Sequence, residues 1–477
     1  RGAFIMPGLI DSHIHLQQYA ESQLMVDCET GTLQECLDRV AKRAASTPPG
    51  EWILGHGWNQ HNWEEGFGTA AMLDAAAPDN PVYLTAKSLH AGWCNTAALK
   101  LMGVDANTPD PHDGRFGRDA RGNPDGILFE SAMEYIEPFL PQPTLERTAA
   151  ALENAQQALW RCGITGVHDF DILDCFKALQ NLHANRLLKL RVVKSIPLEI
   201  LPAAVETGLQ TGFGDDMLRI GSVKLFSDGA LGPRTAAMLS PYENEPGNRG
   251  MLFLDCDQIY EYGRQAAVAG ISLAVHAIGD RANHEVLQGF ARLRQYEEEN
   301  RLPHLRHRIE HVQLLHPDDL PWIARLGITA SMQPIHLPSD WQAANRNWGI
   351  RSECAFAFRS LLNSGTVLAF GSDAPVESPN PFWGIQSAVT RNTAEGNPAG
   401  GWYPDQKLTL PEAIKGFTTG AAFAAGYENK LGRIMPGCLA DLVMLPQDIF
   451  EDPLQELRSI EPLATMVNGV WVWQEND

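Results

Sequence analysis

The chain has 477 residues, of which 44% are hydrophobic and 20% are charged, and its formal net charge is −21. This length is sufficient for a large barrel with an accessory part, and the composition is that of an ordinary globular protein. An acidic surface repels nucleic acids and anionic lipids, so we expect neither a nucleic acid nor a membrane as a partner. The 8 cysteines form no CxxC pair, and no apolar run reaches the length of a membrane span, which favours a reduced, cytoplasmic protein.

Short apolar or β-branched runs recur along the chain, and helical stretches separate most of them. The predicted strands span residues 4–15, 163–170, 188–196, 218–229, 270–280, 307–313, 327–334 and 365–373. Helices are predicted over 144–162, 256–270 and 283–300, and a glycine precedes several strands, as at Gly163, Gly270, Gly327 and Gly365. Strands that alternate with helices in this number predict an α/β fold, a (β/α)8 TIM-type barrel, with an open doubly wound sheet as the alternative.

Two parts of the chain do not fit the barrel. The connection after the first strand is too long for a loop and contains its own strand-like segments, EWILGHGWN and PVYLTAKSLHAGW. Near the end, MVNGVWVW has alternating apolar residues around an Asn-Gly turn, which predicts a hairpin. We therefore expect barrel strand 1 in residues 1–15, an inserted subdomain with the first barrel helices in 16–160, the remaining barrel in 161–430 and a C-terminal β-sandwich part in 431–477.

The stretch PGLIDSHIHL carries two histidines, His13 and His15, that point to the same side of a strand. By themselves they are either a pair of metal ligands or two histidines that share a face. The other strands decide between these, because the working residues of a barrel lie at the carboxyl ends of its strands. Those ends carry further metal-binding or charged residues, namely Lys224, Asp228, His276, Asp280, Glu310, His311 and Asp373. Imidazole and carboxylate are natural ligands of Zn2+, so the convergence predicts a metal centre.

Several segments resemble the amidohydrolase superfamily, and more narrowly its amidohydrolase-3 branch (YtcJ-like, N-substituted formamide deformylase-like). The resemblance is carried by PGLIDSHIH, GITGVHDF, VKLFSDGALGPRTA, HAIGDRAN, HRIEHVQ and GSDAPVESPNP, and SLHAGWCNTAAL and LGRIMPGCLADLVML match as well. It covers essentially the whole chain. The resemblance implies strands before the barrel that complete the β-sandwich. These N-terminal strands are missing from this sequence, which begins without an initiator Met, so we expect residues to precede Arg1 in the full-length protein.

The resemblance also implies a ligand set. His13, His15 and Asp373 would bind one metal, and His276 and His311 would bind a second. Lys224 would bridge the two as a carbamate, because a free ammonium has no lone pair with which to bind a cation. The implied cofactor is one or two Zn2+ ions per chain, or another divalent metal, with a single ion expected if Lys224 is unmodified.

This site implies a metal-dependent hydrolase that cleaves a carbon–nitrogen bond of amide or formamide type in a small molecule. A metal-activated hydroxide would attack the carbonyl carbon, and Asp373 would act as general base and then as general acid toward the leaving nitrogen. Two alternatives stay open. One is a mononuclear deaminase of a heterocyclic ring, against which Lys224 argues, and the other is a non-catalytic barrel scaffold. We expect the chain to form a homodimer.

Candidate substrate-binding residues come from the loops and the insertion, and they are His90, Trp93, Asp228, Arg234 and Asp280. Arg234 would bind a substrate carboxylate or carbonyl, or else hold its own loop. Asp280 would orient the ring of a ligand histidine. The aromatic patch around Trp58 and Trp63 would line the pocket or form the core of the insertion. His336 follows the seventh strand closely enough to be a pocket candidate.

Overall fold

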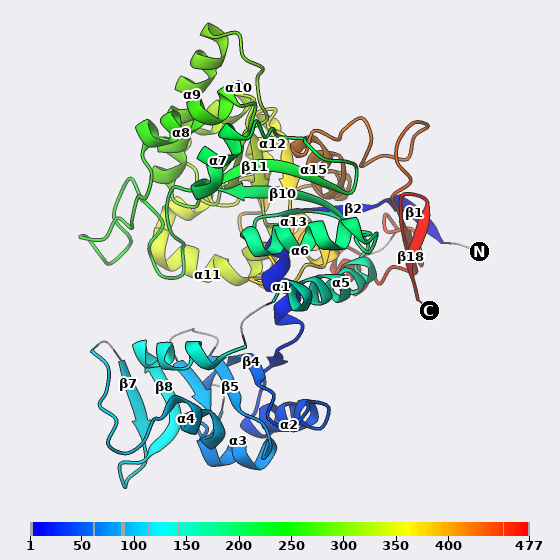
Figure 1. Ribbon diagram of the computed structural model, residues 1–477. Helices are drawn as coiled ribbons and strands as arrows, with labels where there is room; N and C mark the ends of the chain where they lie inside the picture. Colours follow the sequence, from blue (N-terminus) through cyan, green and yellow to red (C-terminus); the bar gives the residue numbers. More distant parts are fainter. Residues whose placement is uncertain are drawn as a thin grey trace. The chain divides into compact units, whose positions relative to one another are not determined.

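The computed structural model describes residues 3–60, 63–86, 91–112, 114–141, 144–451 and 453–475. The chain divides into two compact units. The barrel unit consists of Arg1–Tyr19 and Thr148–Asp477, and the inserted unit is Ala20–Arg147 (Figure 1). Each unit has its own sheets and its own hydrophobic core.

The barrel unit is built on an eight-stranded sheet in which every neighbouring pair is parallel. Its strands, in order around the sheet, are β2 (Leu9–Ile14), β9 (Ile164–Asp169), β10 (Arg191–Pro197), β11 (Leu218–Phe226), β12 (Leu273–Ala277), β13 (Arg308–His311), β14 (Thr329–Met332) and β15 (Leu368–Phe370). Seven of these strands fall within segments predicted from the sequence, and β10 extends one residue beyond its segment, so the predicted barrel is confirmed.

Helices lie on the outside of this sheet (Figure 1). They are α1 (Leu16–Ser22), α5 (Leu145–Arg161), α6 (Leu173–Ala184), α7 (Leu201–Glu206), α8 (Cys256–Val268), α9 (Asp280–Glu299), α10 (Leu320–Arg325), α11 (Leu337–Trp348), α12 (Phe358–Asn363), α13 (Pro381–Thr390), α14 (Leu410–Lys415) and α15 (Ala421–Ala424). The predicted helices are present as α5, α8 and α9. The four glycines predicted to precede strands, Gly163, Gly270, Gly327 and Gly365, all adopt positive φ, as helix-ending glycines do.

The first and last strands of the barrel meet through backbone hydrogen bonds beyond their regular ladders. The amide N–H of Asp373 donates to the carbonyl of His13 at 2.7 Å, and that of His15 donates to the carbonyl of Ala374 at 2.9 Å. These two bonds hold the carboxyl end of β15 against that of β2. They therefore bring Asp373 beside the two histidines predicted as ligands.

Gly371, just after β15, approaches β2 so closely that no side chain fits. A Cβ atom at Gly371 would lie 2.4 Å from the backbone nitrogen of His13 and 2.6 Å from Oδ1 of Asp11. We expect Gly371→Ala to force the two strands apart and to lower the free energy of unfolding by about 1–3 kcal/mol, measured by urea denaturation. Gly247→Ala is the control, because nothing lies within 4 Å of a Cβ atom there. Equal losses in the two variants would contradict this interpretation.

A separate four-stranded antiparallel sheet lies beside the barrel and has the order β1 (Phe4–Pro7), β16 (Leu442–Leu445), β17 (Ala464–Val467) and β18 (Val470–Gln474). The segment 4–15, predicted as one barrel strand, is therefore two strands in different sheets. The break falls where Pro7 has no N–H to donate and where a Cβ atom on Gly8 would lie 2.3 Å from Oγ1 of Thr165. The predicted hairpin is confirmed, since Asn468 and Gly469 adopt φ of 52° and 78° between β17 and β18.

The inserted unit contains a six-stranded mixed sheet and helices α2 (Leu33–Ala44), α3 (Ala70–Ala76) and α4 (Thr96–Met102). The order of its strands is β3 (Val26–Asp27), β4 (Ile53–Trp58), β5 (Val82–Ala86), β6 (Ala91–Cys94), β8 (Pro124–Glu130) and β7 (Gly114–Arg118). Trp58, Trp63 and Trp93 pack together in its core, with ring centroids 6.0–6.4 Å apart. The aromatic patch noted in the sequence thus forms the core of this unit.

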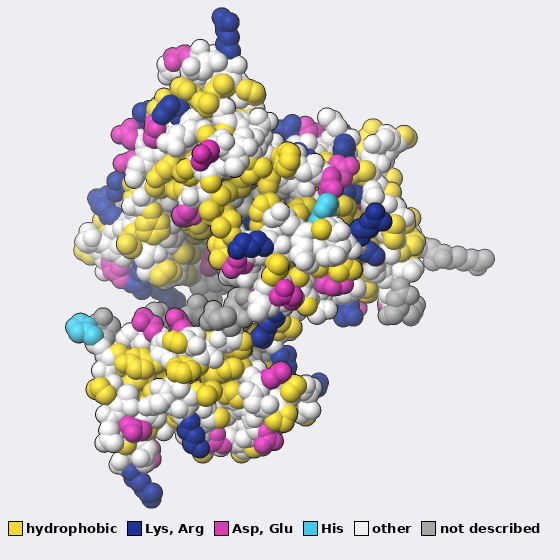
Figure 2. Space-filling view, viewed as in Figure 1, with side chains coloured by type: hydrophobic (Ala, Val, Ile, Leu, Met, Phe, Trp, Pro, Cys, Tyr) yellow, Lys and Arg dark blue, Asp and Glu magenta, His cyan; other side chains and the backbone are white. Residues whose placement is uncertain are grey.

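The outer surface of the barrel unit carries charges of both signs (Figure 2). On the face of the barrel unit drawn in Figure 2, acidic and basic side chains are interspersed in small groups among apolar ones, without a continuous basic area. Among the described residues, no helix combines the length and the apolar character needed to cross a membrane.

Candidate metal centre

A cavity of about 340 Å³ opens at the carboxyl ends of the barrel strands, and the described residues that line it belong to the barrel unit. Its wall contains all the ligands that the sequence resemblance implies, namely His13, His15, Lys224, His276, His311 and Asp373. His336 lines the same cavity. Residues that are as much as 360 positions apart in the chain are thus brought to one place.

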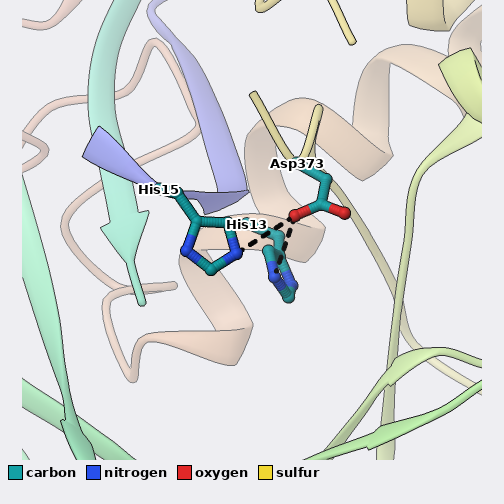
Figure 3. A group of neighbouring side chains, drawn as sticks. All are labelled: His13, His15 and Asp373. Carbon is teal, nitrogen blue, oxygen red and sulfur yellow. Dashed lines mark ion pairs between the residues drawn. The ribbon is translucent and has the colours of Figure 1, made fainter. Parts of the chain in front are cut away.

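His13, His15 and Asp373 form one cluster in the wall of the cavity (Figure 3). The Nε2 atoms of both histidines lie 3.4 Å from the same oxygen of Asp373, Oδ1. One donor atom from each of the three residues lies within 4.8 Å of the others. Two imidazole nitrogens and a carboxylate oxygen facing one point are a donor set that suits Zn2+ and similar ions.

The ring of His13 is held from behind by Glu310. Nδ1 of His13 lies 2.6 Å from Oε2 of Glu310, and both side chains are almost completely buried. Burial alone would raise the pKa of Glu310, but Arg308 and His13 hold it well below its usual value. The ionised Glu310 therefore accepts the Nδ1–H of His13, which leaves the lone pair of Nε2 free to face Asp373.

His15 has an equivalent partner in Asp171. Nδ1 of His15 lies 3.3 Å from Oδ1 of Asp171, whose carboxylate also accepts the backbone N–H groups of Gln17 and Gln18. Burial alone would lower the pKa of His15, but hydrogen bonds with Asp171 and Asp373 raise it to about 9. Both histidines of the HxH pair thus have a carboxylate at Nδ1, the usual arrangement around metal-binding imidazoles.

Asp373 and His311 have unusual backbones. Their φ angles are 62° and 74°, in the left-handed region that residues other than glycine seldom adopt. In a regular strand Glu310 and His311 would point to opposite faces. The left-handed residue at the end of β13 ends this alternation, so that Glu310 supports His13 while His311 lines the cavity. Such conformations concentrate at functional sites.

Lys224 lies in the cavity wall in an apolar setting. Its Nζ is 4.5 Å from the ring centroid of Phe170 and 4.9 Å from that of Phe226, and among the described residues it makes no ion pair. Burial lowers the pKa of Lys224 to about 8, although Glu310 and Asp373 oppose this shift. A fraction of the amine is therefore neutral near pH 7, and the neutral amine is the nucleophilic form.

His276 is fixed by a backbone carbonyl. Its Nε2 donates a hydrogen bond to the carbonyl oxygen of Gly229 at 3.0 Å. Burial, and then the charge of Lys224, lower the pKa of His276 to about 3, so the ring is neutral. Since Nε2 carries the proton, the lone pair of His276 is on Nδ1.

Three of the predicted substrate-binding residues hold loops near the cavity. Asp228 accepts the backbone N–H groups of Ala237, Ile278 and Gly279, Arg234 pairs with Glu245, and Asp280 accepts the N–H of Leu239. Burial raises the pKa of Asp228 to about 7 despite these three bonds. The carboxylate of Asp228 lies 3.6 Å from Nε2 of His276, and the orienting role of Asp280 stays a prediction.

The insertion contributes two of the predicted substrate-binding residues, His90 and Trp93. His90 lies outside the described residues. Trp93 is fully buried in the core of the inserted unit, which favours a packing role. Contact of either residue with a substrate stays a prediction.

A (β/α)8 barrel with such a donor set at the carboxyl ends of its strands defines the class of metal-dependent hydrolases. Residues 1–473 match the amidohydrolase family, Amidohydro_3, and the chain belongs to this family. It is 33% identical to the putative amidohydrolase YtcJ of Bacillus subtilis, over 100% of this chain and 90% of that protein. It is 28% identical to the N-substituted formamide deformylase of Arthrobacter pascens, over 98% of this chain and 88% of the deformylase.

Solved structures agree with this assignment. The crystal structure of an uncharacterized metal-dependent hydrolase from Pyrococcus furiosus superposes with a TM-score of 0.76 at 31% identity, covering 94% of this chain and 88% of that one. A second, from Pyrococcus horikoshii, superposes with a TM-score of 0.77 at 27% identity, covering 95% and 88%. The family and the barrel fold inferred from the sequence are thereby confirmed.

Proposed function

We propose that this metal-dependent hydrolase cleaves a carbon–nitrogen bond of amide or formamide type in a small molecule, with a divalent cation, Zn2+ in the first place, held by His13, His15 and Asp373. The observation that carries the proposal is the convergence of both Nε2 atoms on Oδ1 of Asp373 at the edge of the cavity. A bound cation of this kind lowers the pKa of a water molecule to about 7 and polarises a carbonyl group.

Asp373 is the proposed general base and general acid. Burial alone would raise its pKa, but His13, His15 and His311 hold it well below its usual value, so the carboxylate is ionised at neutral pH. An ionised carboxylate within reach of the attacking water accepts its proton. The same group then delivers that proton to the leaving nitrogen, which departs as the neutral amine.

The remaining polar residues of the cavity complete the proposed centre. Glu310 and Asp171 bind Nδ1 of His13 and His15, so that Nε2 of each ring is the nitrogen directed toward the cation. We assign His276 and His311 to a second cation, as the resemblance implies. Because the pKa of Lys224 is lowered, its neutral amine is available to react with CO2, and the resulting carbamate would supply an anionic bridge between two cations.

N-substituted formamides and small amides are the proposed substrates. The relative from Arthrobacter pascens is named for the deformylation of N-substituted formamides. The apolar part of the cavity wall would accept an apolar N-substituent, and it consists of Phe226, Ala230, Leu231, Ile278 and Val376. A volume of about 340 Å³ suits a small molecule.

The proposed function is tested by removing and restoring the metal. We expect protein treated with a chelator to release no amine from N-benzylformamide, and full activity to return when Zn2+ is added. Formate and benzylamine are both quantified. A panel of aminated purines and pyrimidines, followed by release of ammonia, tests the deaminase alternative. Hydrolysis that persists in metal-free protein, or turnover of the heterocycles alone, would contradict the proposal.

A further inference from the structure

His336 approaches the side of Asp373 that His13 and His15 leave free. Its Nε2 lies 3.8 Å from Oδ2 of Asp373, whereas the two histidines of β2 face Oδ1. The residue is only 9% exposed, and its Nε2 is buried without a hydrogen-bond partner among the described residues. A buried polar atom without a partner lowers the free energy of unfolding, so we expect this nitrogen to bind a ligand.

His311 has the same property. Its Nδ1 is also buried and without a hydrogen-bond partner in the part of the chain that the structure describes. The rings of His311 and His336 are nearly parallel, with an interplanar angle of 22° and centroids 6.2 Å apart. One donor atom each from His311, His336 and Asp373 lies within 4.8 Å of the others. A single cation at this point would be within reach of one nitrogen of each imidazole.

The local fold fixes the position of His336. It is the last residue of the 3-10 turn Pro334–His336, which leads directly into α11. His311 is the last residue of β13, and Asp373 follows β15 by three residues. Donor atoms held by β13, by this turn and by the segment after β15 therefore face one another across the cavity.

We propose that His336 is a metal ligand, which joins His276 and His311 at the second cation, on the side of Asp373 that carries Oδ2. Asp373 then offers Oδ1 to the first cation, and its Oδ2 is left to accept the proton of the attacking water. Three protein donors with an open fourth position are typical of catalytic zinc sites. This inference rests on the proposed function, since it takes the first cation to be bound by His13, His15 and Asp373. It adds to the second site a ligand that the sequence resemblance does not include.

The test is a Zn2+ titration of metal-free protein against a chromophoric chelator, with the bound metal counted by mass spectrometry. We expect two Zn2+ per wild-type chain. In His336→Ala we expect the affinity for one Zn2+ to fall by more than about 100-fold, beyond the effect of losing a partner behind a ligand, while the other ion stays bound. In His336→Phe, which keeps a flat ring against His311, we expect the same loss. His284→Ala is the control, because His284 is a partly exposed histidine paired with Asp319 outside the cavity.

The outcomes separate this inference from the function on which it rests. If wild-type protein binds no Zn2+ and does not hydrolyse formamides, the proposed function fails. If His336→Ala and His336→Phe both bind two Zn2+ with unchanged affinity, only the second site is overturned, whatever happens to turnover. Cobalt-substituted protein gives a further readout, because loss of the His336 imidazole must change the visible d–d spectrum of the second ion. An unchanged spectrum would also overturn the inference.

Discussion

The Asp373→Asn variant is expected to keep its fold and to lose hydrolysis of N-benzylformamide by a factor of about 100 to 10,000. Asn has nearly the same shape, and the backbone N–H of Asp373 that bonds to His13 is unaffected by the change. The amide can neither take a proton from water nor supply one to a leaving nitrogen, and it is a weaker donor to a cation. Turnover is measured as amine release at saturating Zn2+, and folding by circular dichroism and urea denaturation.

A matched control separates this effect from the loss of any buried carboxylate. Asp319 is also largely buried and bonded to a histidine, His284, but both lie away from the metal cavity. Asp319→Asn is expected to retain wild-type turnover. Wild-type turnover in Asp373→Asn at saturating metal would exclude Asp373 as the general base and would overturn the mechanism proposed for this site.

The barrel could be predicted from the sequence because each strand ends in a recognisable way. Apolar runs of strand length are followed by polar residues, and glycines before them end the preceding helices, as at Gly163 and Gly327. The working residues of a barrel lie at the carboxyl ends of its strands. From this rule we predicted that His13, His276 and Asp373 lie together, and all three line one cavity. This prediction of a shared cavity depends on which strand each residue follows, and it does not depend on the distances between their side chains.

The supporting contacts could not be predicted in the same way. Glu310 lies 297 residues from His13, and nothing in HRIEH distinguishes a residue that holds a ligand from one that is a ligand. His336 was only a pocket candidate, because PIHL contains a single histidine after a short strand and its partner atoms come from β13 and β15. The Pro7-Gly8 pair does indicate the break between β1 and β2. The apolar residues on both sides of the pair nevertheless predict one continuous strand.

Glu310→Gln is expected to weaken binding of Zn2+ at the first site by about 10- to 100-fold, even though the substitution preserves shape. The amide nitrogen of Gln can donate to Nδ1 of His13, which would move the proton of the ring to Nε2. That nitrogen faces Asp373 at 3.4 Å and would lose the lone pair that binds the cation. We expect 15N NMR of His13 to report the change of tautomer, and chelator competition to report the lower affinity.

The same substitution also leaves Arg308 without its counter-charge. Nε of Arg308 lies 2.5 Å from Oε1 of Glu310 in the barrel interior, so the free energy of unfolding is expected to fall by about 3–5 kcal/mol. Glu297 offers a matched control, because this buried carboxylate joins Arg294 to His307 in the same manner, at 2.6 Å and 3.0 Å, but outside the cavity. Glu297→Gln should lose comparable stability and keep its affinity for Zn2+. Equal losses of affinity in both variants would mean that Glu310 acts only through stability, whereas a loss confined to Glu310→Gln makes it the residue that positions His13.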